Sequence, residues 1–160
     1  MTQQKFEFEG ARELARNLDQ SETIIKGALN KALRKIGKHL VPALKNNTPR
    51  RVGTLANSTR FQIIGSPADQ KLEIRQSAKT PGGDFYGAFV RQGTRPHEIR
   101  PVKAKALAFQ IGNRTIFAKR VYHPGTKPNP YHIDTMNEEH GEIQRIVTEA
   151  GIDVAAQLTR

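Results

Sequence analysis

The chain has 160 residues, a formal net charge of +11 and a pI near 10.3, with no cysteine and no tryptophan. This length predicts a single domain over residues 1–160. The lack of cysteine excludes disulfides, thiolate metal sites and cysteine nucleophiles. No apolar run approaches the roughly 20 residues that cross a bilayer, and the start MTQQKFEFEG lacks a signal-peptide layout. We therefore expect a protein that is made and used in a cytoplasm, without a membrane partner.

The charge is unevenly distributed. Residues 1–22 carry a net −2, residues 23–127 a net +17 and residues 128–160 a net −4. An excess of lysine and arginine concentrates polyanions. The middle of the chain therefore predicts an anionic partner, and the acidic ends predict contacts with basic surfaces.

The first third of the chain predicts a strand and two helices. Residues 5–9 alternate phenylalanine with charged neighbours, which is typical of a half-buried strand, and residues 11–18 predict a short helix. An acidic cap at Asp19, with a glutamate three positions later, predicts the start of a second, longer helix that runs to about Asn46. Pro42 removes one backbone hydrogen bond, so we expect a kink or short break near it.

The long second helix has two contrasting faces, assigned at about 100° per residue. One face predicts a core, which we expect to bury Ile25, Leu29, Leu33, Ile36 and Leu40. The opposite face is almost purely cationic. This face is either simply solvated, or it contacts DNA or an acidic surface of a neighbouring subunit. The candidate contact residues lie on it or just after the helix: Lys31, Arg34, Lys35, Lys38, Lys45, Arg50 and Arg51.

The middle of the chain predicts strands. Residues 55–64 and 71–76 are expected to pair antiparallel around a Gly-Ser-Pro turn, and residues 77–84 predict a mobile loop. Residues 85–91 fit either a strand or a helical turn. Two further apolar runs, 107–111 and 115–118, flank Gly-Asn-Arg and predict a hairpin.

The last part of the chain predicts a proline-rich connector and a helix. Pro124, Pro128 and Pro130 indicate an extended segment. From Tyr131 onward, apolar residues recur at steps of three or four, which predicts one long helix with an acidic outer face, weakened at its glycines by about 1 kcal/mol each. The expected fold class is α+β, with a mainly antiparallel sheet packed with a long second helix and a C-terminal helix.

Motifs for catalysis or metal binding are missing from the sequence. No HExxH pattern, Gly-x-Ser-x-Gly elbow or phosphate loop ending in Gly-Lys-Ser/Thr occurs. His97 and Glu98 could meet the segment His123 to His132 around a metal, but both lie in proline-rich connectors that commonly serve turns. We therefore expect no enzymatic activity, no cofactor and no metal.

An ordered set of short motifs resembles the neck or tail-completion (head–tail joining) proteins of long-tailed bacteriophages. The first half carries Gly-Ala-Arg-Glu-Leu at 10–14, the helix at 28–44 and Thr-Pro-Arg-Arg-Val-Gly-Thr-Leu at 48–55. The second half carries the segments 86–94, 105–109 and 123–131 in the same order as the family. The family-motif residues are Gly53, Leu55, Tyr86, Gly93, Thr94, His123, Pro124, Gly125 and Pro130.

The resemblance implies a non-enzymatic virion protein at the head–tail junction. Its partners would be copies of itself in a ring, a portal-side connector, and tail-terminating or tail-tube proteins. Double-stranded DNA would pass through the ring without sequence-specific contacts. A second interpretation, independent of the resemblance, is a basic nucleic-acid-binding protein that uses the helix face of Lys31 to Lys45 on a duplex backbone.

Overall fold

The computed structural model describes residues 11–50, 53–80, 82–102 and 104–159. The predicted strand at 5–9 and the candidate contact Arg51 lie outside the described residues. The chain divides into two compact units. Unit 1 contains the described residues up to Gln76 and those from His132 onward, and unit 2 is Ser77–Tyr131. A single domain over residues 1–160 stays a prediction, which one cooperative unfolding transition would confirm.

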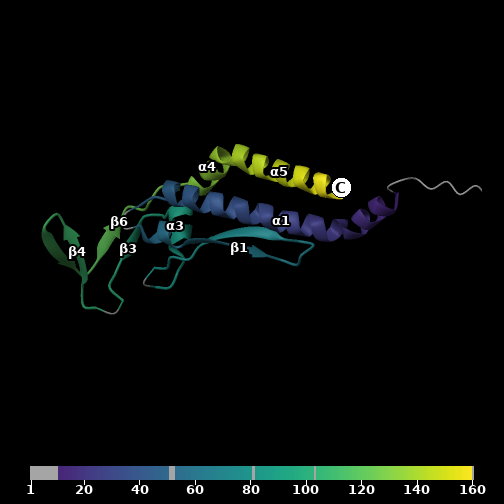
Figure 1. The fold of residues 1–160 in the computed structure, drawn as a ribbon. Coiled ribbons are helices and arrows are strands. Elements are labelled where there is room, and N and C mark those ends of the chain that lie inside the picture. The colour runs from purple at the N-terminus through teal and green to yellow at the C-terminus, as the bar shows by residue number, and fades with distance from the viewer. Residues whose placement is uncertain (1–10, 51–52, 81, 103, 160) are drawn as a thin grey trace, which may run out of the picture. The chain divides into compact units, whose positions relative to one another are not determined.

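The first element of unit 1 is one continuous helix, α1 (Ala11–Asn47), drawn from purple to blue in Figure 1. The prediction of two helices separated near Asp19 is wrong. No glycine or proline interrupts the sequence at this point, so Asp19 lies inside the helix and caps nothing. The helix also continues through Pro42 without the expected break.

Burial along α1 follows only part of the predicted core face. Ile36 and Leu40 are buried as expected, together with Ala32 and Leu44. Leu33 is only half-buried. The predicted burial of Ile25 and Leu29 is wrong, since their exposed fractions are 49% and 38%. The apolar cluster around α1 is built on its residues 32 to 40, which leaves the preceding turns outside it.

A two-stranded sheet packs against α1. It follows a one-turn helix, α2 (Thr54–Asn57), and consists of β1 (Thr59–Ile64) and β2 (Lys71–Gln76), paired antiparallel as predicted. The expectation that the strand starts at residue 55 is wrong, because Leu55 is buried within α2.

The sheet approaches α1 closely at one glycine. A Cβ added to Gly37 would lie 2.5 Å from the ring of Phe61 on β1. The absence of a side chain at Gly37 therefore lets the sheet lie directly on the helix.

The C-terminal part of the chain forms α4 (Tyr131–Glu138) and α5 (His140–Leu158), where one helix was predicted. The break is at Glu139, close to the predicted weak point at Gly141. Helix α5 lies along α1 in Figure 1. Its Ile146 is 2% exposed and completes the apolar cluster with α1.

Unit 2 contains a short helix and four short strands. The sequence of residues 85–91 fitted either a strand or a helical turn, and in the structure this segment is helix α3 (Tyr86–Gln92). The strands are β3 (His97–Ile99), β4 (Leu107–Ile111), β5 (Arg114–Ala118) and β6 (Val121–His123). Strands β4 and β5 form the predicted hairpin, and β3 pairs antiparallel with β6.

The fold class is α+β, as predicted. The strands of the described residues form three separate two-stranded antiparallel sheets, β1-β2, β3-β6 and β4-β5, and not one larger sheet. Each sheet is built from strands of three to six residues, and two of them are direct hairpins. In unit 1, α1 lies between α5 and the β1-β2 sheet (Figure 1).

The loop at 77–84 has internal hydrogen bonds. The Thr80 amide donates to the Asp84 carbonyl (2.8 Å) and the Gly83 amide to the Thr80 carbonyl (2.9 Å). Within the loop, the Lys79 ammonium lies 5.3 Å from the centre of the ring of Phe85, the residue that follows the loop. The predicted mobility of this loop stays a prediction, which limited proteolysis of the full chain would test.

Candidate functional site

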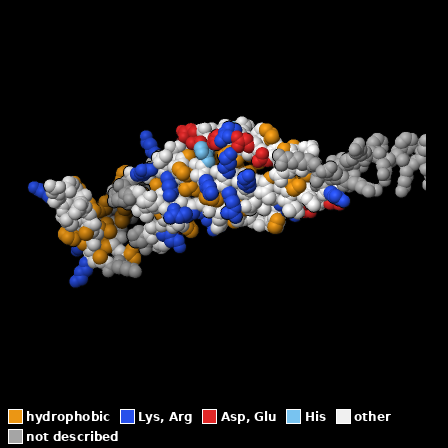
Figure 2. All heavy atoms as spheres, viewed as in Figure 1, with side chains coloured by type: hydrophobic (Ala, Val, Ile, Leu, Met, Phe, Trp, Pro, Cys, Tyr) orange, Lys and Arg blue, Asp and Glu red, His pale blue; other side chains and the backbone are white. Residues whose placement is uncertain are grey.

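The predicted cationic face is a real feature of α1. Lys31, Arg34, Lys35 and Lys38 are exposed along one side of the helix, and Lys45 is half-buried on the same side. Figure 2 shows the basic side chains of α1 beside acidic side chains of the C-terminal helices. The expected acidic outer face of those helices is therefore corrected, because several of the carboxylates lie toward α1.

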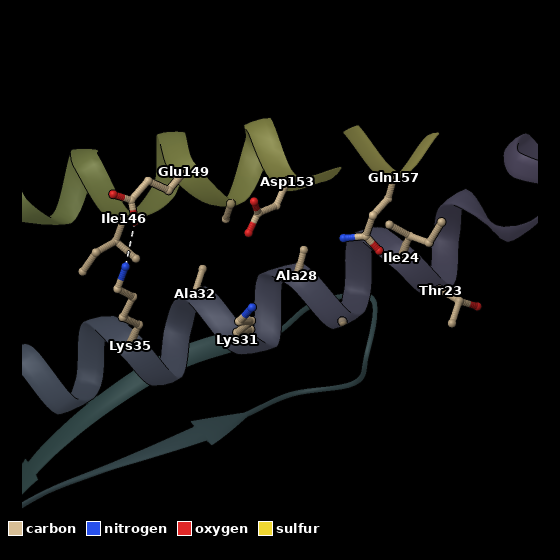
Figure 3. A pocket seen from close by; sticks show the side chains of 12 residues that line it. Thr23, Ile24, Ala28, Lys31, Ala32, Lys35, Ile146, Glu149, Asp153 and Gln157 are labelled. Atoms are coloured by element: carbon tan, nitrogen blue, oxygen red, sulfur yellow. Dashed lines mark hydrogen bonds and ion pairs between the residues drawn. The ribbon is translucent and has the colours of Figure 1, made fainter. Parts of the chain in front are cut away.

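In the N-terminal half of the basic face, Lys35 is paired with a carboxylate of the same chain. The Lys35 ammonium donates to Glu149 of α5 at 2.7 Å, and the exposed pair is drawn in Figure 3. This hydrogen bond lowers the pKa of Glu149. Glu149 also accepts from Arg145, which in turn binds Glu142 (2.5 Å). A polyanion approaching Lys35 would meet these carboxylates as well.

A groove of about 400 Å³ lies beside this pair and is lined by residues of both α1 and α5 (Figure 3). Its walls combine small apolar side chains with charged ones from both helices. Asp153 points from α5 into the gap, while Ala28 and Ala32 point toward α5 from the other side. Lys31 lines the same groove. Cations and carboxylates are therefore mixed along this half of α1.

Two further contacts tie the C-terminal helices to α1. The His39 imidazole and the Glu139 carboxylate lie 2.5 Å apart, at the break between α4 and α5. The Asn47 side-chain amide donates to Thr135 (3.0 Å) and to Glu138 (2.7 Å). These contacts hold the junction of α4 and α5 against α1.

The C-terminal half of the basic face is different. Lys38 and Lys45, two helical turns apart on α1, line a groove of about 340 Å³ with Arg60 of β1. Among the described residues, none of these three side chains has an acidic partner within ion-pairing distance. Val41 and Phe61 supply apolar walls. This groove gathers three cations of two elements, at which an anion would meet no ion-paired carboxylate of the described residues.

The Arg60 guanidinium is held in place by the backbone. Its Nη1 donates to the carbonyls of Asn57 and Thr59, both at 2.7 Å. Its other nitrogens have no hydrogen-bond partner in the described part of the chain. An anchored, planar guanidinium loses little freedom on binding, which suits it to phosphate or carboxylate oxygens.

The remaining predicted contact residues lie apart from the groove lining. The Arg34 Nε donates to Asn30 (2.8 Å), and Arg50 donates to the Lys45 carbonyl (3.1 Å) at the end of α1. A cation at a helix C-terminus interacts favourably with the helix dipole. The structure accounts for Arg50 without a ligand.

The family-motif residues occupy turns and an isolated antiparallel β-bridge between Thr94 and Thr126, which we call the clasp. Gly53 precedes α2 with φ of 75°, and Leu55 lies in that helix. Tyr86 opens α3, and Pro130 directly precedes α4. In the clasp, the Thr94 and Thr126 amides each donate to the other residue's carbonyl, at 3.0 and 3.1 Å.

The clasp requires glycine at two positions. Gly93 has φ 71° and ψ −178°, a conformation that only glycine adopts readily. A Cβ on Gly93 would overlap the Thr126 carbonyl, and one on Gly125 would overlap the Thr94 carbonyl. Residues 93–96 and 125–128 share the pattern Gly-Thr-x-Pro, and in the structure these two segments pair with each other.

Two of the five histidines meet. The His97 and His123 rings stack with centroids 5.2 Å apart, and these residues face each other in the β3-β6 ladder beside Pro124. The His97 Nδ1 lies 2.8 Å from the Arg95 carbonyl, and the Gly125 amide donates to the His123 Nδ1 at 3.0 Å. Across the described residues, no group of three or more His, Asp or Glu side chains could hold a metal ion.

Sequence reasoning did not place Arg60 beside Lys38 and Lys45. Arg60 belongs to the acid-free interval from Thr23 to Ala68, but periodicity along a helix cannot place a strand residue beside Lys38. The signal that was available is compositional, since the interval contains nine basic residues and no acidic one.

No helix in the described part of the chain combines the length and apolar character that a membrane span needs. Comparison of the chain with protein-family models, with curated proteins and with solved structures finds no match.

Proposed function

We propose that this chain is a structural, non-enzymatic virion protein of a tailed bacteriophage that joins head and tail as part of a ring-like neck or tail-completion assembly. The observation that supports this proposal most directly is the ordered set of motifs, in which glycines lie at defined turns. Gly53, Gly93 and Gly125 have positive φ values. A turn with positive φ favours glycine, which gives these motif positions a physical reason.

The proposal places the protein in the virion, at the head–tail junction, after assembly in the host cytoplasm. Large apolar side chains remain exposed in both units, such as Ile25 in unit 1 and Phe117 in unit 2. Such side chains favour burial against copies of the chain or against connector and tail proteins.

Deletion of the gene from a phage that encodes this chain tests the proposal. We expect separate DNA-filled heads and finished tails by electron microscopy, with joined particles restored when the gene is supplied in trans. Joined, infectious particles without the gene would contradict the proposed function.

A second candidate function is sequence-independent nucleic-acid binding, and one observation favours it. The groove of Lys38, Lys45 and Arg60 presents three cations without an acidic partner among the described residues. On duplex DNA, log affinity falls with log salt by about 0.9 for each phosphate that the protein neutralises. Removal of a cation that neutralises a phosphate should therefore make this dependence shallower by about 0.9.

Two triple variants with equal loss of charge separate a specific role of the groove from a general charge effect. Lys38→Gln, Lys45→Gln and Arg60→Gln remove the groove cations. Lys31→Gln, Arg34→Gln and Lys35→Gln remove the N-terminal half of the face, in which Lys35 is paired with Glu149. If the groove binds duplex DNA, the first triple should lower the salt slope by about 2 to 3 and the second by less than about 1. Equal slopes for wild type and both variants would exclude this function for the groove.

A further inference from the structure

The β4-β5 hairpin of unit 2 exposes apolar side chains. Ile111, Ile116 and Phe117 are exposed by 60%, 37% and 71%. Within the described residues, β4 and β5 pair only with each other. A two-stranded hairpin is marginally stable in water unless a further layer covers it. The exposed apolar side chains and the two-stranded sheet are therefore typical of a surface that binds another protein.

The strand β5 carries apolar side chains on both faces of the hairpin. Ile111 pairs with Arg114, and Phe109 pairs with Ile116, so these four residues share one face. Phe117 follows Ile116 directly and lies on the opposite face. Because β5 has no strand neighbour on its outer side among the described residues, a partner along this edge can contact both faces.

Cationic side chains flank these apolar ones. Arg114 begins β5, and Lys119 is exposed directly after its end. We define the hairpin surface as Ile111, Arg114, Ile116, Phe117 and Lys119.

Unit 2 has a large excess of positive charge around this surface. Residues 77–131 contain ten basic and two acidic residues, a net +8. One of the two acidic residues, Glu98, is bound to Arg100 at 2.5 Å. A partner that covers the hairpin surface must therefore supply both apolar area and negative charge.

The C-terminal helices carry a surface with the complementary properties. Residues 131–160 contain six acidic and two basic residues, a net −4. On α4, Ile133 is 53% and Met136 44% exposed. Asp134 is exposed and forms no ion pair with the described residues, and Glu138 accepts from the uncharged amide of Asn47. We define the α4 surface as Ile133, Asp134, Met136 and Glu138.

We propose that the hairpin surface of one copy docks on the α4 surface of a second copy. Burial of Ile116 and Phe117 against Ile133 and Met136 supplies the apolar contact. Arg114 and Lys119, at the two ends of β5, meet Asp134 and Glu138 at the edge of that contact. A phosphate backbone fits less well, because it offers no apolar surface to cover the hairpin.

This contact is head-to-tail, because the two surfaces are different parts of the same chain. Each added copy leaves one hairpin surface and one α4 surface open, so association continues until a ring closes or a filament forms. The inference rests on the self-assembly that the proposed function expects, and it names the surfaces that carry the assembly.

Paired charge reversals test the contact on the full chain. The hairpin variant carries Arg114→Glu and Lys119→Glu, and the α4 variant carries Asp134→Lys and Glu138→Lys. Alone, each variant opposes like charges at every contact, so its assembly should need a concentration higher by about 100-fold or more. Light scattering coupled to size-exclusion chromatography measures this shift.

A mixture of the two variants provides the decisive measurement. In alternating order every contact again joins opposite charges, so the equimolar mixture should assemble near the wild-type concentration. An effect confined to one chain cannot be rescued by mixing. A control with Arg91→Glu and Lys127→Glu changes the charge of unit 2 equally, away from the hairpin, and should assemble like wild type.

Several results would overturn the inference. These are a wild-type chain that stays monomeric at high concentration, reversal variants that assemble like wild type, and folded variants that mixing does not rescue. Loss of DNA binding by the hairpin variant with unchanged assembly would assign the surface to nucleic acid instead. Joined particles after deletion of the gene would contradict the proposed function and leave this contact standing.

Discussion

The two units of the chain differ in the interactions that stabilise each of them internally. Of the nine apolar residues that are buried in the described structure, seven lie in unit 1 and two, Ala78 and Tyr131, lie in unit 2. Unit 1 has a helix covered on two sides, whereas unit 2 has two small two-stranded sheets, a short helix and a glycine-dependent clasp. Packing of apolar side chains therefore contributes more to the stability of unit 1, and local backbone geometry contributes more to that of unit 2.

The largest expected effect is in the core of unit 1. Leu40→Ala should lower the free energy of unfolding by about 2 to 5 kcal/mol, because Leu40 is 2% exposed within the apolar cluster. Val147→Ala on α5, where the side chain is 54% exposed, should change it by less than about 0.5 kcal/mol. Urea unfolding of both variants measures the difference. Equal values would contradict the packing of α1 against its neighbours.

The next effect concerns the clasp of unit 2. Gly93→Ala should cost about 1 to 3 kcal/mol, because the position requires a glycine conformation and the new Cβ would overlap the Thr126 carbonyl. Gly112→Ala is the matched control, since Gly112 also has positive φ but open space around its Cα. Its cost should be about 1 kcal/mol. A Gly93 variant that unfolds like the Gly112 variant would show that the close approach contributes nothing.

A smaller effect is expected at a buried hydroxyl in unit 1. The Thr48 hydroxyl donates to the Leu44 carbonyl (2.5 Å) and accepts from Gln76 (3.0 Å). Thr48→Val should cost about 1 kcal/mol, because Gln76 keeps its bond to the Thr59 hydroxyl. Thr54→Val, at an exposed position, should leave the urea midpoint almost unchanged. A neutral Thr48→Val would show that these hydrogen bonds do not stabilise unit 1.

The smallest effect is the pH dependence of the exposed Lys35–Glu149 pair. The hydrogen bond from Lys35 lowers the pKa of Glu149 in the folded chain. The stabilisation is therefore present above the unfolded pKa of about 4.3 and is lost as the pH falls through the folded pKa. Glu149→Gln should reduce the thermal midpoint slightly at about pH 6 and not at about pH 2.

The partner residue provides the control for this pair. Lys35→Gln should produce a smaller loss of stability near neutral pH than Glu149→Gln, because Glu149 keeps its contact with Arg145. The double variant should lose no more than Glu149→Gln alone. Additive losses would show that the two side chains act independently.

Local patterns in the sequence determined several elements of this protein. Alternation of apolar residues around turn residues predicted the β4-β5 hairpin and the β1-β2 pair, because side chains in a strand alternate between its two faces. The repeat of three to four residues predicted helix after Tyr131 and the cationic face of α1. These features depend on neighbours within a few positions, which is the range over which periodicity carries information.

The tertiary structure alone decided which cations of α1 remain available. Lys35 and Lys38 look equivalent in the sequence, but α5 brings Glu149 to Lys35 and β1 brings Arg60 to Lys38. The pairing of Thr94 with Thr126 could likewise not be predicted from the sequence, although both residues lie in segments with the pattern Gly-Thr-x-Pro. Contacts between residues far apart in the chain depend on how the elements pack, and no pattern along a single element encodes that packing.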